Sequence, residues 1–217
     1  HRFDARLSGR RLKLGHLRFY AILGALGIAL PMCIFAYVAP KLPAAIVAVT
    51  QTLIPIITYA LALAVGAERF RWLSAMGIAL GFAGVLFIVV PGGSLPEPAM
   101  ASWVLVLLLT AFSLALAFIA AARFRPSETA SLSVAAGTLS VGALFLLPVM
   151  AIEGSWWLLD SGLDEGAMSL LAMAALNALL LVFFYEIVRL AGPVFCSTNN
   201  YVVPIAGVAW GMVIFGD

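Results

Sequence analysis

Two segments of the sequence place a side-chain amide four residues before a proline, inside long apolar stretches. Gln51 precedes Pro55, and Asn200 precedes Pro204. Proline has no N–H, so in a helix it cannot donate to the carbonyl four residues earlier. Each segment is therefore predicted to present a free carbonyl beside an amide. Unpaired polar groups are costly in a bilayer. The segments indicate either two helix kinks satisfied by neighbouring helices or water, or a polar cavity that the two kinks flank.

Other polar residues share these faces or stand alone in apolar stretches. Tyr59 lies eight residues after Gln51, along the same helical stripe, and Asn177 lies in the middle of another apolar stretch, where an amide needs a partner. The predicted substrate-binding residues are Gln51, Tyr59, Asn177, Asn199, Asn200 and Tyr201, with Pro55 and Pro204 as helix kinks.

One acidic residue comes close to the membrane interior. Glu186 is followed three residues later by Arg189, a spacing that suits an ion pair at the membrane surface. The alternative is a carboxylate that couples transport to protons. We favour the ion pair and keep Glu186 as the candidate for coupling.

The elements that must position these residues are apolar stretches of about 20 residues, the length of a helix that crosses a bilayer. The chain is 64% hydrophobic and only 10% charged, which excludes an ordinary soluble domain. Continuous apolar runs also exclude the alternating pattern of a membrane β-barrel. The sequence predicts an all-α polytopic membrane protein with seven helices, at 19–43, 44–66, 72–91, 102–122, 130–152, 167–188 and 193–215.

Basic residues fall in alternate gaps between these stretches. Eleven of the twelve Lys and Arg lie in the opening segment and in the gaps at 67–71, 123–129 and 189–192, and the other is Lys41. By the positive-inside rule these gaps are cytoplasmic. The seven helices then alternate without conflict, beginning in the cytoplasm. These cations set the orientation of the helices in the membrane, so they do not indicate a nucleic-acid partner. We expect a lipid bilayer as partner and no nucleic acid.

Residues for metal binding or covalent chemistry are sparse. Cys33 and Cys196 lie apart inside apolar stretches, and the two histidines are in the basic opening segment. No Cys or His cluster and no nucleophile–base pair has the spacing of a metal or catalytic site. We expect no cofactor, no metal and no enzymatic activity.

The two proline segments are also related by a constant offset. The pairs Gln51/Asn200, Pro55/Pro204 and Glu68/Asp217 are each separated by 149 residues. Five crossings separate the acidic ends Glu68 and Asp217, so the two segments have opposite orientations in the membrane. Inverted repeats of this kind are common in secondary transporters, where substrate sites lie at the repeat interface near the midplane.

These features resemble the EamA-type exporters of the drug/metabolite transporter superfamily. The matching stretches are 43–91, with a small-residue helix, a central proline, Gly66-Ala67-Glu68 and a glycine-rich helix, and 191–217. The family usually has Glu where this chain has Asp217, and Gly-Glu where it has Gly-Ala-Glu. The resemblance implies ten helices in two inverted five-helix repeats, of which these seven are the third to ninth. We expect a partial first repeat at 1–91, an external linker at 92–101 and a partial second repeat at 102–217.

By resemblance, the expected function is secondary transport in the bacterial inner membrane. A small metabolite, amino acid or drug-like compound would be exported by alternating access around the Gln51 and Asn200 level. A homodimer is left open. The alternatives are an intramembrane enzyme that modifies lipids, which would need acid, base or nucleophile residues, and a membrane scaffold that transports nothing.

Overall fold

The computed structural model describes residues 14–89, 100–126, 129–154, 165–203 and 205–206. All regular elements in these ranges are helical. They are α1 (Leu14–Gly24), the π-helix η2 (Ala25–Ala29), α2 (Leu30–Val38), the 3₁₀ turn η3 (Ala39–Lys41), α3 (Ala44–Gln51), α4 (Ile54–Ala64), α5 (Trp72–Val89), α6 (Ala101–Arg123), α7 (Ser131–Glu153), α9 (Glu165–Ala191) and α10 (Pro193–Ser197).

Five helical segments among the described residues are long and apolar enough to cross a membrane. They are His16–Val38, Ile46–Ala64, Ala101–Arg123, Ser131–Glu153 and Gly166–Ala191. A shorter apolar helix covers Trp72–Gly84. Each agrees with a predicted stretch to within a few residues, which confirms the prediction of an all-α polytopic membrane protein. The predicted last helix is described only from Pro193 to Ala206, without Pro204.

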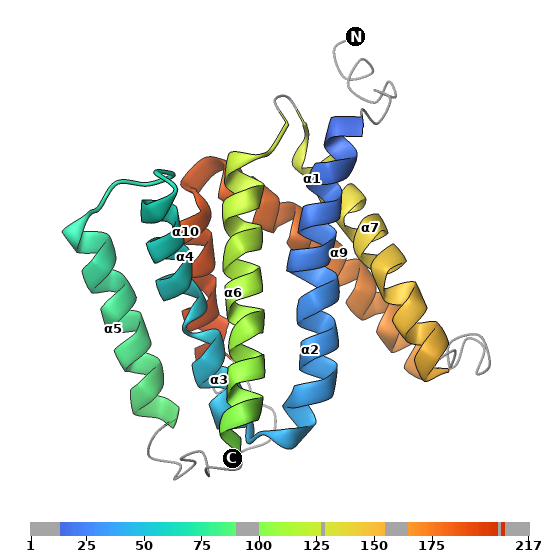
Figure 1. Ribbon diagram of the computed structural model, residues 1–217, viewed down its shortest axis with the longest axis horizontal. Coiled ribbons are helices and arrows are strands. Elements are labelled where there is room, and N and C mark those ends of the chain that lie inside the picture. Colours follow the sequence, from blue (N-terminus) through green and yellow to red (C-terminus); the bar gives the residue numbers. More distant parts are fainter. Residues whose placement is uncertain (1–13, 90–99, 127–128, 155–164, 204, 207–217) are drawn as a thin grey trace.

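Helix α6 stands at the centre of the bundle, with α5 at one edge and α7 and α9 at the other (Figure 1). It contributes to each of the four clusters of buried apolar residues. About half of its span is buried (56%), against 17% for α7 and 6% for α9. The sequence explains this difference, because the second half of α6 is rich in alanine and lets neighbouring helices approach closely.

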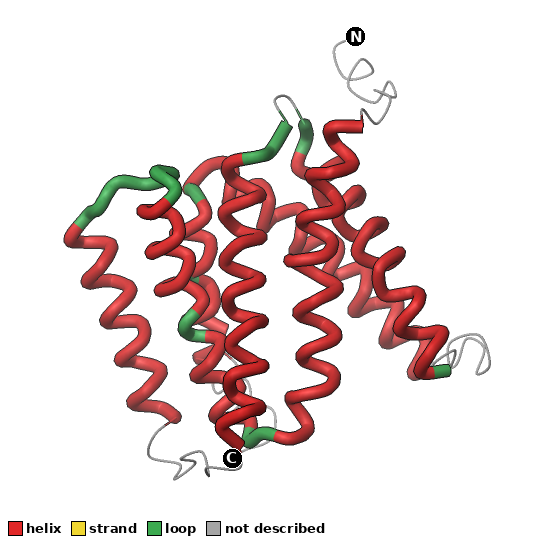
Figure 2. Tube along the Cα trace, viewed as in Figure 1, coloured by secondary structure: helices red, strands yellow, loops and turns green. Residues whose placement is uncertain are grey.

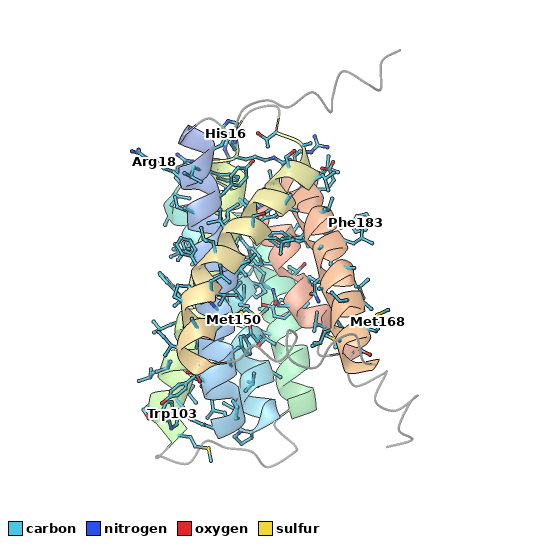
Figure 3. All side chains as sticks on the ribbon, turned by 90° about the vertical axis from the view of Figure 1, so that its right-hand side faces the viewer. His16, Arg18, Trp103, Met150, Met168 and Phe183 are labelled. Carbon is cyan, nitrogen blue, oxygen red and sulfur yellow. The ribbon has the colours of Figure 1, made fainter. Side chains whose placement is uncertain are left out.

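The described ends of the bundle differ in charge. The C-terminal ends of α4, α6 and α9, which with the segments after them carry the arginines of those gaps, lie at the same end as the start of α1 (Figure 1). His16 and Arg18 are at this end, and Trp103 is at the opposite one (Figure 3). Lys41 lies beside Trp103, 3.2 Å from the Tyr37 ring centroid and 4.0 Å from that of Trp103. The helices therefore alternate in direction as the charge pattern predicts.

Candidate functional site

The helix that carries Gln51 is broken at the predicted place. Helix α3 ends at Gln51, Thr52 and Leu53 form a turn, and α4 begins at Ile54 with Pro55 in its first turn (Figure 2). Proline suits this position because the first N–H groups of a helix have no internal partner. The backbone bonds of the turn end on Ala48, Val49 and Thr50, and none ends on the carbonyl of Gln51. The break thus leaves this carbonyl without its helical bond.

Three buried hydroxyl groups surround the break, and each is satisfied locally. Thr50 donates to the carbonyl of Ile46 at 2.8 Å, Thr52 to that of Val49 at 2.6 Å and Thr58 to that of Ile54 at 2.7 Å. Such bonds back to the preceding turn are usual for threonine in membrane helices. The half-buried amide of Gln51 differs, because it has no hydrogen-bond partner within the described ranges. Gln51 therefore keeps both its amide and its carbonyl available.

The helix that carries Asn200 is also broken, but the break lies at a different distance from its proline. Helix α10 ends at Ser197, Thr198 forms a turn, and helical backbone resumes at Asn199. The half-buried Asn200 donates its amide to the carbonyl of Ser197 at 2.8 Å, while Asn199 is exposed. The break comes six residues before Pro204, and in the first copy it comes immediately before the helix that holds Pro55. Pro204 itself lies outside the described residues.

The two broken helices lie against each other, since α4 and α10 are in direct contact. Tyr59 and Tyr201 belong to one buried cluster, together with Val194 of α10. The hydroxyl of Tyr201 is buried and has no hydrogen-bond partner among the described residues. Its ring lies against Gly81 of α5, where an added Cβ would be 2.5 Å from Tyr201 Cδ2. The structure therefore brings two of the predicted site residues together and leaves one hydroxyl group available.

Tyr59 has a structural use for its own hydroxyl. It accepts a bond from the Arg71 N–H at 3.0 Å and donates to the Arg71 carbonyl at 3.3 Å. These two bonds fasten the segment between α4 and α5 to the body of α4. The Tyr59 ring lies in a buried cluster, and its polar atom is already paired.

Asn177 lies apart from these residues. It is exposed on α9 and donates its amide to the Met173 carbonyl one turn earlier, at 2.9 Å. The same helix carries Met168 and Phe183, which point away from the bundle (Figure 3). Among the described residues, the Asn177 amide is therefore bonded within its own helix and not to the broken helices.

Glu186 lies in a network at the basic end of the bundle. Its carboxylate pairs with Arg189 and accepts a hydrogen bond from the Ser131 hydroxyl. Arg125 donates to Ser131 Oγ at 3.0 Å and to the carbonyl of Tyr185 at 3.0 Å. Burial, and next the nearby charge of Arg189, lower the pKa of Arg125 from its ordinary value. The network ties the α6–α7 connection to α9, and it agrees with the ion pair that the sequence favoured.

Sequence reasoning missed three polar or helix-breaking positions in the first span and in α6. Pro31 is buried in the first turn after the π-helix η2, and Ser113 donates to the carbonyl of Leu26 at 2.7 Å. Thr110 is fully buried, and its hydroxyl has no partner among the described residues. A proline inside an apolar stretch was the available signal, because proline always removes one helical hydrogen bond.

Residues 5–90 match the model of the EamA-like transporter family. No curated protein and no solved structure matches the chain. The family match confirms the resemblance on which the sequence-based expectation of transport rested.

Proposed function

We propose that this EamA-like membrane protein is a secondary transporter that exports a small metabolite, amino acid or drug-like compound. The substrate would bind between the two broken helices, at the level of Gln51, Asn200 and Tyr201. The observation that carries the proposal is the contact between α4 and α10, each of which adjoins a break in the helical backbone, at residues 52–53 and at Thr198. Discontinuous helices at a repeat interface are a recurring form of substrate site in secondary transporters.

The polar groups at these breaks suit a substrate that carries a neutral or zwitterionic polar group. The Gln51 amide and the Tyr201 hydroxyl lack partners among the described residues, and the Gln51 carbonyl lacks its helical bond. Buried polar groups without partners are destabilising, so their retention suits a ligand that completes them. Together they offer donors and acceptors but no fixed charge.

Alternating access would then follow from movement of the broken helices against each other. Each break is a place where a helix can bend with little loss of backbone bonding, because a bond is already missing. Opening on one side and closing on the other would expose the site to each face in turn. We propose a proton gradient or substrate exchange as the driving force, with Glu186 as the carboxylate to test.

Counterflow into proteoliposomes tests the proposal directly. The full-length protein is reconstituted and preloaded with candidate amino acids, small metabolites or drug-like compounds, and uptake of the same labelled compound is measured. We expect accelerated exchange for at least one class, saturable and absent from empty liposomes. Chemical conversion of the lipid without any exchange would instead indicate the intramembrane enzyme, and neither activity would favour the scaffold.

A further inference from the structure

The first membrane span contains a short π-helix directly before a proline. Residues Ala25–Ala29 form η2, and the N–H of Leu30 donates to the carbonyl of Ala25, five residues earlier. Pro31 follows in the next position and is buried. Short π segments inside α-helices are rare and often occur at functional sites.

The hydrogen-bond register decides which carbonyl this proline leaves without a partner. Bonds in a π-helix join residues five apart, so Pro31 leaves the carbonyl of Leu26 without a backbone donor. Bonds in an α-helix join residues four apart, so Pro31 would instead leave the carbonyl of Gly27 unpaired. The identity of the unpaired carbonyl therefore reports the register of the span.

A hydroxyl from a distant helix satisfies the carbonyl of the π register. Ser113 of α6 donates to the Leu26 carbonyl at 2.7 Å, and its side chain is only 3% exposed. In the α register Leu26 would receive the N–H of Leu30, and the unpaired carbonyl would move one residue along. That step is about 1.5 Å in rise and 100° in rotation, which turns the new carbonyl away from Ser113.

The part of the span before η2 is in close backbone contact with α7, and the part after it contacts α6 through side chains. An added Cβ at Gly24 would be 2.8 Å from the Gly142 N of α7, so the two backbones are in close contact there. Beyond η2, Val38 packs in one core cluster with Leu107 of α6, while Met32 on another face of α2 is 61% exposed. A change of register would therefore rotate α2 and leave α1 in place.

We propose that Ser113 selects the π register of the first span, and that the span has a second, α-helical register in which α2 is rotated. Pro31 and Ser113 act as a pair, because the proline removes one backbone bond and the hydroxyl restores it only in the π form. The inference does not rest on transport, since it concerns the free protein and predicts a change that needs no substrate.

Spin-label distances in the purified full-length protein test this inference. Labels are placed at Met32 on α2 and at Leu109 on α6, both exposed, with Cys33 and Cys196 replaced by alanine. A rotation of about 100° moves a side-chain tip by up to about 8 Å on a helix of ordinary diameter. The π register and the α register should give two distinct distances. Ser113→Ala should raise the population with the α-register distance, relative to that with the π-register distance, by roughly 3- to 18-fold, the equilibrium effect of one hydrogen bond between membrane helices.

Thr110→Val is the matched control, because it removes a hydroxyl that is buried one turn away and has no partner in the described part of the chain. The distances should not change in this variant. A change of the same size in Thr110→Val, or unaltered distances in Ser113→Ala, would overturn the proposal.

Pro31→Ala provides the second test and also covers the case that Ser113→Ala does not fold. Alanine at position 31 supplies an N–H in either register, so the population with the α-register distance should increase. In this background Ser113→Ala should fold and should add no further change, because Leu26 no longer depends on the hydroxyl. A double variant that keeps the original distance would refute the two-register span.

Discussion

Replacement of Gly81 by alanine tests whether this glycine is needed for a close contact with Tyr201 or is only one of several glycines in the helix. Helix α5 carries Gly77, Gly81 and Gly84 along one stripe. A Cβ at Gly81 would lie 2.5–3.0 Å from three atoms of the Tyr201 ring, while one at Gly77 or Gly84 meets nothing described within 4 Å. The ring is 7% exposed and cannot move freely. The three substitutions are chemically identical and differ only in this contact.

The expected magnitudes follow from two opposing effects. Exchange of glycine for alanine inside a helix gains about 1 kcal/mol of stability. Overpacking of a well-filled site costs about 1–3 kcal/mol. Gly77→Ala and Gly84→Ala should therefore be neutral or stabilising. Gly81→Ala should be less stable than either by about 1–3 kcal/mol, or about 2–12 °C in Tm for a chain of this size.

Thermal unfolding in one detergent, followed by circular dichroism, measures this difference. The same substitution in a Tyr201→Ala background isolates the contact, because Gly81→Ala should then lose its penalty. Equal Tm values for Gly81→Ala and Gly77→Ala, or a penalty that persists without the Tyr201 ring, would show that the contact is not the cause.

Three further predictions follow from the described contacts. Tyr59→Phe removes both bonds to the Arg71 backbone, so we expect a loss of about 0.5–1.5 kcal/mol in thermal unfolding and faster amide exchange around Arg71, and slower exchange would contradict this. Glu186→Gln should leave driven transport largely intact in proteoliposomes, since the carboxylate serves an exposed ion pair, and abolished driven transport with retained exchange would identify it as the coupling group. Cysteines replacing Lys41 and Arg71 should react with a membrane-impermeant reagent from opposite sides, the first from outside, and labelling from one side would refute the topology.

Much of the architecture could be predicted because hydrophobic length and loop charge act locally. A bilayer requires about 20 apolar residues per helix, so the boundaries of α6 and α7 could be predicted from the sequence to within a few residues. The break before Pro55 followed in the same way, from the missing N–H of proline. These features depend on residues that are close together in the chain.

Features that depend on distant partners were not predictable. The contact of Gly81 with Tyr201 and the bond from Ser113 to Leu26 join residues far apart in sequence, and no local pattern distinguishes them from neighbouring Gly and Ser residues. The position of the second break was missed for a different reason: the Asn200 amide bonds the Ser197 carbonyl three residues earlier, and the missing N–H of Pro204 does not predict this local bond. Side-chain bonds of this kind compete with the regular helix and shift where it breaks.

The central claim is that the polar groups at the broken helices bind the transported compound. Gln51→Ala tests it most directly, because the Gln51 amide has no described partner, whereas the Asn200 amide already donates to the Ser197 carbonyl at the end of α10. Affinity and Tm are measured on the same purified full-length protein, with a compound found by counterflow and with Gly77→Ala as the control. The account predicts about 2- to 13-fold weaker binding with unchanged Tm, the effect of one neutral hydrogen bond. Unchanged affinity together with a lower Tm would contradict it.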